Sequence, residues 1–290
     1  MAPHFHCSKM SGQTINQSSE SKMNNANSLL FVPGSRPERF NKALEAGADV
    51  VVIDLEDAVG PADKDTARTA LAGWLGTSRP VLIRINAAET PWFAADLALL
   101  AQTGIAGVVL PKAERPEDIA AASAAGKGLP VWPLIETARG FAHRHALARC
   151  AKVERLIFGT IDFQADLNMR CGEDELLPFR AGLVLASRLA GIAAPIDGVC
   201  TAIDNGELLL AESQRARRLG FGGKLCIHPK QVDVVNRAFT PSADDVAWAQ
   251  RVIDADARAG GAAVAVDGKM VDRPVVLRAT TILREARARQ

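Results

Sequence analysis

Short apolar runs alternate with amphipathic stretches eight times along this chain from Ser28 onward. The runs lack polar alternation, which is typical of parallel strands covered on both faces. Eight such strand–helix units predict an α/β fold, a (β/α)8 TIM barrel, which typically needs about 250 residues. The predicted strands are Leu29–Pro33, Val50–Asp54, Val81–Asn86, Gly107–Pro111, Val131–Glu136, Arg155–Thr160, Ala194–Val199 and Gly223–His228.

The sequence predicts three segments along the chain. Residues 1–27 are rich in Ser, Asn and Gln, and we expect a disordered extension there that lacks the marks of a signal or transit peptide. The barrel is expected over residues 28–240. Residues 241–290 exceed what a barrel needs, and we expect a helix, a hairpin or lid and a closing helix that pack on the barrel or on a neighbouring subunit.

Composition narrows the class of protein. The formal net charge is +1, which gives no field for holding nucleic acid or an anionic membrane. No apolar run approaches the roughly 18 residues of a membrane span. The five cysteines are scattered without a C-x-x-C pair, so reduced thiols in the cytoplasm are expected rather than a zinc site or disulfides. Tyrosine is absent, and acid–base chemistry must fall to carboxylates, lysine or histidine.

Ionisable and amide side chains gather where the predicted strands stop. Active sites of (β/α)8 barrels lie at the carboxyl ends of the strands, so this pattern predicts an enzyme. One member of this group, His228, either lines the pocket or forms a hydrogen bond within its own loop. The residues at or just past the strand ends are Asp54, Glu56, Asp57, Arg84, Asn86, Glu136, Asp162 and His228.

Glu136 and Asp162 follow neighbouring predicted strands, the fifth and the sixth. Adjacent parallel strands lie roughly 4.8 Å apart, so the two carboxylates can share one cation. Two protein oxygens with open positions for water and substrate are the usual arrangement for Mg²⁺. The alternative is that each carboxylate caps the helix that follows it. The position on adjacent strands favours the metal.

Arg84 is a charged residue in an otherwise apolar strand, and a buried guanidinium requires a partner. One interpretation is a salt bridge to Glu56 or Asp57. The other, which we favour, is a fork bound to a substrate carboxylate or carbonyl oxygen. Because side chains alternate along a strand, Asp54 and Glu56 are expected to point the same way and Asp57 to turn away. Glu56 and Asp57 are expected to hold metal-bound waters or Arg84 rather than the metal itself.

Nine segments carry a resemblance to known proteins, in order over residues 28–283: residues 31–40, 52–59, 84–86, 110–114, 134–140, 158–163, 196–199, 220–231 and 267–274. Together they resemble the citrate lyase β-subunit-like family, within the group of HpcH/HpaI-type aldolases and acyl-CoA lyases. No single segment suffices, but the set is specific. One departure lies in the loop after the sixth strand, which reads Ala-Asp-Leu-Asn-Met where relatives often have glycine after the leucine.

The resemblance implies a role for particular residues. Glu136 and Asp162 would hold Mg²⁺, Glu136 thereby also contacting the substrate, and Arg84 would bind the oxo-acid portion of the substrate. Backbone amides of the loop that begins with Gly159 and Thr160 would meet the substrate carboxylate. In related lyases the aspartate that matches Asp272 comes from a neighbouring subunit and acts as acid or base.

The resemblance also implies a reaction. A Mg²⁺-dependent lyase would cleave or form a 3-hydroxyacyl-CoA thioester, such as citramalyl-, malyl- or citryl-CoA, with acetyl-CoA or another acyl-CoA and a 2-oxo acid as the products of cleavage. Two alternatives stay open: a citrate lyase β subunit that acts on an acyl-carrier-protein thioester, and a malyl-CoA-type thioesterase. Since subunits would share a site through Asp272, we expect a homo-oligomer, a trimer or a multiple of it.

Overall fold

The computed structural model describes residues 23–288 except 24, 77–78, 171, 173 and 261. This part of the chain divides into two compact units, one that ends at Val235 and one that begins at Asn236. Helix α10 (Val232–Phe239) spans the boundary. The predicted extension therefore lies mostly outside the described residues. Ala26 and Asn27 nevertheless belong to the first unit, because Ala26 is buried and the Asn27 side chain donates to the Gly222 carbonyl at 2.7 Å.

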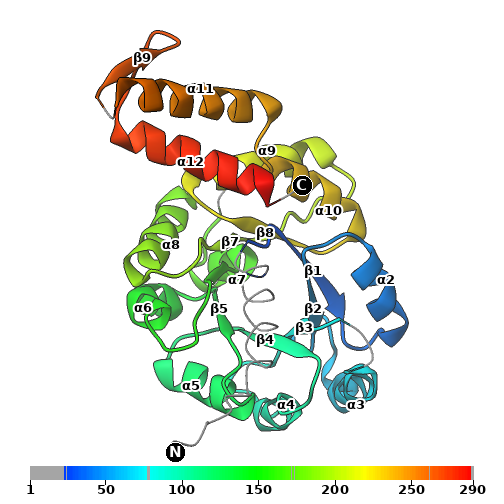
Figure 1. The fold of residues 1–290 in the computed structure, drawn as a ribbon. Helices are drawn as coiled ribbons and strands as arrows, with labels where there is room; N and C mark the ends of the chain where they lie inside the picture. Colours follow the sequence, from blue (N-terminus) through cyan, green and yellow to red (C-terminus); the bar gives the residue numbers. More distant parts are fainter. Residues whose placement is uncertain are drawn as a thin grey trace, which may run out of the picture. The chain divides into compact units, whose positions relative to one another are not determined.

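Eight parallel strands close into a barrel in the first unit, and each pairs with the next along the chain (Figure 1). The barrel closes where β8 pairs with β1, between Ser28 and Lys224 and on to Leu30 and Cys226. This confirms the predicted (β/α)8 fold. The strands are β1 (Ser28–Pro33), β2 (Val50–Asp54), β3 (Val81–Arg84), β4 (Ile105–Leu110), β5 (Val131–Ile135), β6 (Ile157–Phe158), β7 (Ile196–Asp197) and β8 (Gly223–Cys226).

Helices connect successive strands outside the ring (Figure 1). Short 3-10 turns that begin with proline precede several of them, because proline's fixed φ suits the first helical position. These turns are η1 (Pro37–Arg39), η2 (Pro61–Asp63) and η3 (Pro229–Gln231). The helices are α2 (Phe40–Glu45), α3 (Lys64–Trp74), α4 (Phe93–Leu99), α5 (Pro116–Ala125), α6 (Ala138–Ala148), α7 (Thr160–Asp166), α8 (Leu177–Ala190) and α9 (Gly206–Leu219).

The barrel interior is filled by apolar side chains from every strand. Apolar side chains thus fill the centre of the barrel below the carboxyl ends of its strands. Its buried members are Ala26, Leu29, Val50, Val52, Leu82, Val109, Trp132, Leu134, Ile157, Ile196 and Leu225.

Several strands end earlier than the apolar runs predict. The sixth run continues to Thr160, but β6 ends at Phe158, and the eighth continues to His228, but β8 ends at Cys226. Strands in a barrel are staggered, so the last residues of a run find no partner on one side and pass into the loop. Of these loop residues, Gly159, Thr160 and Ile227 line a pocket at the mouth of the barrel.

The second unit has a small core of its own. Ser242 begins α11 (Ala243–Ala259) with a reciprocal capping box to Asp245. An antiparallel hairpin, β9 (Val264–Val266) and β10 (Lys269–Val271), then leads into α12 (Arg273–Arg287). This is the predicted order of helix, hairpin and closing helix. The buried core consists of Ala249, Val252, Val271, Ala279 and Ile282.

Within the part of the chain that the structure describes, no helix is both long enough and apolar enough to cross a membrane. The thiols of Cys150, Cys200 and Cys226 are free, while Cys7 and Cys171 lie outside the described residues. Burial raises the pKa of the Cys226 thiol to about 12, so this thiol is held in its unreactive protonated form.

A buried ionic network ties two helices to two strands of the barrel. Asp197, at the end of β7, accepts a hydrogen bond from Arg180 Nε of α8 at 2.8 Å. Its other oxygen lies 3.3 Å from Lys224 Nζ of β8, which also faces Glu212 of α9 at 3.2 Å. Burial alone would raise the pKa of Asp197, but the two cations lower it below its usual value. The carboxylate is therefore charged at neutral pH and compensates two buried cations.

We expect Asp197→Ala to lower the free energy of unfolding by about 3–5 kcal/mol, because it leaves buried cations without this carboxylate. Asp204 provides a control, since it forms an exposed ion pair with Lys230 at 2.7 Å. Asp204→Ala should cost less than about 1 kcal/mol. Urea denaturation at pH 7 measures both, and a similar small loss in both variants would contradict the structural role of the network.

Candidate active site

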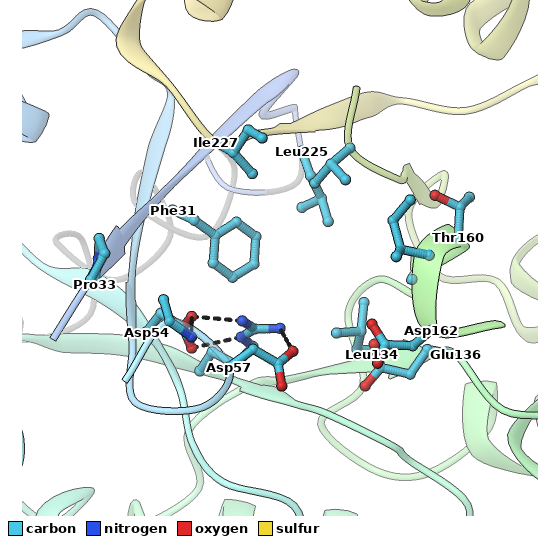
Figure 2. Close-up of a pocket in the computed structure, with 15 residues that line it drawn as sticks. Phe31, Pro33, Asp54, Asp57, Leu134, Glu136, Thr160, Asp162, Leu225 and Ile227 are labelled. Carbon is cyan, nitrogen blue, oxygen red and sulfur yellow. Dashed lines mark hydrogen bonds and ion pairs between the residues drawn. The ribbon is translucent and has the colours of Figure 1, made fainter. Parts of the chain in front are cut away.

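A pocket of about 370 Å³ opens at the carboxyl ends of the barrel strands (Figure 2). Acidic side chains lie in two groups on its wall, one after β2 and the other after β5 and β6, while apolar side chains of β1 and β8 face them (Figure 2). The residues that line it include Phe31, Pro33, Asp54, Asp57, Arg84, Leu134, Glu136, Gly159, Thr160, Ile161, Asp162, Leu225 and Ile227. The strand ends thus bring most of the predicted site residues together.

Arg84, the last residue of β3, is held by three carboxylates. Its Nε and Nη2 bind the two oxygens of Asp54 at 2.7 and 2.6 Å, which is a bidentate fork. Nη1 lies 3.0 Å from Glu56 Oε2 and 3.3 Å from Asp57 Oδ2. Burial alone would lower the pKa of Arg84, but these carboxylates raise it, and the guanidinium stays charged. The salt-bridge interpretation therefore describes this structure, with Asp54 as an additional and closer partner.

The predicted alternation around Asp54 does not hold beyond the strand. Asp54 and Glu56 were expected to point together and Asp57 to turn away, yet all three reach Arg84. The reason is that β2 ends at Asp54, and the next residues form a turn in which the twofold alternation of a strand no longer applies. The Asp54 carboxylate shapes this turn, because it accepts from the backbone amides of Glu56 and Ala58 at 2.8 and 3.2 Å.

A buried lysine supports the same turn, and sequence analysis gave it no role. Lys64 Nζ, at the start of α3, donates to the carbonyls of Leu55 and Glu56 at 2.7 Å each and to Asn86 Oδ1 at 2.6 Å. Asn86 in turn donates to buried Asp96 of α4 at 2.6 Å. Burial lowers the pKa of Lys64, but all three of its donors are satisfied. The network fixes the backbone on which Glu56 stands.

Glu136 and Asp162 lie on the side of the pocket away from Asp54 and Asp57 (Figure 2). Glu136, directly after β5, is almost fully buried, while Asp162 in the first turn of α7 is partly exposed. Glu136 Oε1 and Asp162 Oδ1 are each 4.0 Å from the same atom, Lys112 Nζ. These two oxygens are therefore separated by at most twice that distance. Burial, with the negative charges of Glu56 and Asp162, raises the pKa of Glu136 to about 8.

The alternative that these carboxylates cap helices is not what the structure shows. Thr137 caps α6, with its hydroxyl accepting from the Gly140 amide at 3.0 Å. The cap position of α7 is Gly159, which has no side chain. Glu136 Oε1 instead accepts the backbone amide of Lys112 at 2.8 Å. Both carboxylates remain directed to the pocket, where a cation would neutralise them.

Lys112, which follows β4, is a second lysine of the site that the sequence alone did not reveal. Its Nζ donates to Glu56 Oε1 at 2.7 Å, and its backbone has a φ of 45°, in the left-handed region. Burial alone would lower the pKa of Lys112, but the hydrogen bond to Glu56 and the other carboxylates raise it. Its segment, Leu-Pro-Lys-Ala-Glu, was identified only as a family motif. A lysine after a strand is otherwise indistinguishable from a surface lysine.

The oxygens of Glu136 and Asp162 fit a hard divalent cation. Both are carboxylates, and both lie beyond hydrogen-bond distance of the Lys112 ammonium. Among the described residues, no group of three or more His, Cys, Asp and Glu side chains is arranged to hold a metal. A site with two carboxylates and open positions suits Mg²⁺, whereas a structural zinc site needs four closely placed ligands.

Gly159 and Thr160 lie at the start of α7. A Cβ added to Gly159 would come within 2.5 Å of the Glu136 Cβ and even closer to its carboxylate, so only glycine fits beside Glu136. The Gly159 amide donates to the Ile135 carbonyl at 3.0 Å. Donors to a substrate carboxylate would therefore come from the amides of Thr160, Ile161 and Asp162, which precede the first helical hydrogen bond, from Phe163 to Gly159.

Two other predicted residues have definite surroundings. His228 accepts from the Lys230 amide at 3.1 Å, which is the loop hydrogen bond that was one of its two interpretations. Asp272 belongs to the second unit, where it caps α12 and its Oδ1 accepts from the Val275 amide at 3.4 Å. The side chain of neighbouring Met270 is largely exposed.

Comparison with known proteins gives a consistent result. The model of the HpcH/HpaI aldolase/citrate lyase family matches residues 27–229. A (3S)-malyl-CoA thioesterase of Cereibacter sphaeroides is 35% identical over 271 residues, which are 90% of this chain and 94% of that protein. A citrate lyase subunit beta-like protein of Mycobacterium tuberculosis is 38% identical over 264 residues, which are 89% of this chain and 94% of that protein.

A solved structure extends the similarity to three dimensions. The crystal structure of protein CitE from Mycobacterium tuberculosis, in complex with magnesium, acetoacetate and coenzyme A, is 37% identical to this chain. It superposes with a TM-score of 0.82 and covers 91% of this chain and 99% of its own. The agreement therefore includes the barrel as a whole.

We expect Gly159→Ala to lower the free energy of unfolding by about 1–3 kcal/mol, because the added methyl group forces Glu136 or the start of α7 to move. Gly206→Ala is the matched control, since a Cβ there meets nothing within 4 Å at the start of α9. That change should leave stability within about 0.5 kcal/mol or raise it. Equal stability of both variants in urea denaturation would show that the close contact at Gly159 is not restrictive.

Proposed function

Because the chain belongs to the HpcH/HpaI aldolase/citrate lyase family, we propose that it is a Mg²⁺-dependent carbon–carbon lyase of 3-hydroxyacyl-CoA thioesters. The products of cleavage would be an acyl-CoA such as acetyl-CoA and a 2-oxo acid. The observation that carries the proposal is the pairing of Glu136 and Asp162 at one pocket whose opposite wall holds Arg84. Citramalyl-, malyl- and citryl-CoA are the candidate substrates.

Glu136 and Asp162 would hold the cation. When bound, Mg²⁺ would act as a Lewis acid that withdraws charge from the oxygens of the oxo acid. The Lys112 amide orients Glu136 by its 2.8 Å hydrogen bond, and the absence of a side chain at Gly159 leaves room for the carboxylate. The raised pKa of Glu136 reflects the cost of collecting carboxylates in a buried place, which a dication would offset.

Arg84 would bind the oxo-acid portion of the substrate. Two of its donors are fixed on Asp54, which sets the plane of the guanidinium, and Nη1 faces the exposed Asp57 carboxylate. A substrate carboxylate could replace Asp57 as the partner of Nη1 without breaking the Asp54 fork. Developing negative charge on the substrate would then meet a cation that is already oriented.

The proposed bond cleavage needs one further group. The carbinol hydroxyl loses its proton to solvent as the bond to the carbon next to the thioester breaks, which gives a 2-oxo acid and a thioester enolate that must gain a proton on carbon. We propose that Asp272 of a neighbouring subunit carries this proton, and that it removes the same proton in the condensing direction. Asp272 lies two residues after the exposed Met270 of the hairpin, separated from it by the buried Val271, and this exposed position beside Asp272 supports an intermolecular role.

Two related functions have support of their own. The similarity to a (3S)-malyl-CoA thioesterase over 90% of this chain supports thioester hydrolysis at the same site, after or instead of carbon–carbon cleavage. The similarity to a citrate lyase subunit beta of Leuconostoc mesenteroides, 34% identical over 281 residues, supports a carrier-protein thioester as substrate. Both functions would use the same proposed metal site and Arg84. They can therefore be distinguished only by the products formed and by whether the substrate is carried by CoA or by a carrier protein.

A panel of 3-hydroxyacyl-CoA thioesters, incubated with the protein and Mg²⁺, tests the proposal. We expect acetyl-CoA or another acyl-CoA together with a 2-oxo acid, and loss of both products when EDTA removes the metal. Mass spectrometry identifies the thioester and a lactate dehydrogenase-type assay detects the oxo acid. Free CoA with an intact hydroxy acid would establish the hydrolase instead, and turnover of an acyl-carrier-protein thioester alone would establish the carrier-dependent lyase.

Asp272→Asn should reduce turnover by about 10²-fold or more, because it removes the proposed proton carrier. Binding of Mg²⁺ and the oxo acid should stay within about twofold, since Asp272 is not proposed as a ligand of either. Mixing Asp272→Asn with Arg84→Ala should restore part of the activity, because some sites would then draw both intact residues from different chains.

The mixing experiment needs proof of subunit exchange, which native mass spectrometry of differently labelled variants provides. Exchange without any recovered activity would refute the shared site. Sedimentation of the wild-type protein as a monomer would refute it as well. The proposed assembly is a homo-oligomer, a trimer or a multiple of it.

A further inference from the structure

Glu56 is a third carboxylate beside the proposed metal ligands, yet it is held away from them. Its Oε1 accepts from Lys112 Nζ at 2.7 Å, and its Oε2 faces Arg84 Nη1 at 3.0 Å. The backbone of Glu56 is fixed in turn, because Lys64 Nζ donates to its carbonyl at 2.7 Å. Side chain and main chain are thus constrained by three different cations.

The Lys112 ammonium is shared unequally among the carboxylates around it. It makes a short hydrogen bond to Glu56 but stays 4.0 Å from Glu136 Oε1 and from Asp162 Oδ1. That distance is too long for a hydrogen bond, although the ammonium carries three donors. The Lys112 ammonium therefore engages Glu56 and makes no hydrogen bond to the other two carboxylates, although the Lys112 backbone amide donates to Glu136 Oε1 at 2.8 Å.

An unrestrained Glu56 would compete for the cation. Its side chain is almost completely buried, and its Oε2 is a buried oxygen without a hydrogen bond of good geometry. Such an oxygen gains much from coordination to a dication nearby. A third protein carboxylate would tighten the metal and occupy a position that a chelating substrate requires, since Mg²⁺ accepts six ligands in a strict octahedron.

We propose that Lys112 is a positioning residue that holds Glu56 out of the metal's coordination sphere, so that only Glu136 and Asp162 coordinate. This rests on the proposed function, because it presupposes the cation at these two carboxylates. Lys112 keeps positions on the metal open for substrate, and it does so by neutralising and directing Glu56. The side chain and the backbone amide of Lys112 thus have different roles, because the amide orients Glu136.

Mn²⁺ is the probe for the test, because it suits the same carboxylate sites as Mg²⁺ and reports its own hydration. Electron paramagnetic resonance gives the dissociation constant, and water proton relaxation gives the number of water molecules on the bound ion. Neither readout depends on turnover. We expect Lys112→Met to bind Mn²⁺ on the order of tenfold more tightly, with fewer coordinated waters, because the freed Glu56 replaces water.

The partner variants should shift binding in definite directions. Glu56→Gln should not tighten binding, and should weaken it to the extent that the released ammonium turns to Glu136 and Asp162. The double variant should return to within about twofold of the wild type, because neither the third carboxylate nor the ammonium remains. Lys112→Arg, which keeps the charge and the donors, should retain the wild-type number of waters. Lys42→Met on exposed α2 is the control for loss of a lysine.

Weaker Mn²⁺ binding by Lys112→Met, or an unchanged number of waters, overturns the inference. If the methionine variant does not fold, as judged by circular dichroism, Lys112→Gln provides the same comparison, since it too removes the charge. Glu136→Gln separates the two proposals. Mn²⁺ binding that is equal in wild type and Glu136→Gln rejects the metal site and the inference with it. Binding that Glu136→Gln abolishes, with unchanged hydration in Lys112→Met, rejects the inference alone.

Discussion

The mouth of this barrel concentrates carboxylates that repel one another, and two cationic side chains hold them in place. Arg84 takes Asp54 in a bidentate fork and also faces Glu56, while Lys112 takes the other oxygen of Glu56. Glu56 thus bridges the two cations and links the two sides of the pocket. Glu136 has no such short contact with a cation, and its pKa is correspondingly raised by burial and by its acidic neighbours.

The order of strands produces this charge balance. Asp54 ends β2 and is in register with Arg84 at the end of β3, Lys112 follows β4, and Glu136 follows β5. Four consecutive strands thus bring a carboxylate, two cationic side chains and a second carboxylate to one rim. Asp162, in the helix that follows β6, adds a third carboxylate. Because parallel strands place all their carboxyl ends on one side, residues far apart in sequence become neighbours only when the barrel closes.

The fold could be predicted from the sequence because apolar runs without polar alternation leave few architectures open, and the structure confirms each of the eight strands. Glu136 and Asp162 could be selected because Glu136 ends the fifth predicted strand and Asp162 follows the sixth. The residues that fix the turn carrying Glu56 were not predictable in the same way. Lys64 and Asp96 lie on helices, where their spacing resembles that of surface residues, and burial alone reveals their role.

The predicted side-chain directions after β2 were wrong for a different reason. Strand alternation applied to Asp54 but not to Asp57, because the chain turns as soon as the strand ends. The turn itself is stabilised by hydrogen bonds from backbone amides to Asp54. Side-chain directions can therefore be predicted within an element, whereas those in a functional loop depend on tertiary contacts that the local sequence does not encode.

The charged residues at the rim of the pocket are already committed to ion pairs or to the proposed metal, which limits which group can carry a proton. Arg84 and Lys112 have raised pKa values and keep their protons at neutral pH. Asp54 and Glu56 are fixed in ion pairs, and Glu136 and Asp162 are the carboxylates that a cation would need deprotonated. Of the described residues at this rim, the charged ones are suited to bind and to orient a substrate. A group that protonates carbon must alternate between two protonation states, and a carboxylate outside these ion pairs meets that condition better. The proton carrier is therefore better sought outside this rim, and this is the role proposed for Asp272 of a neighbouring subunit.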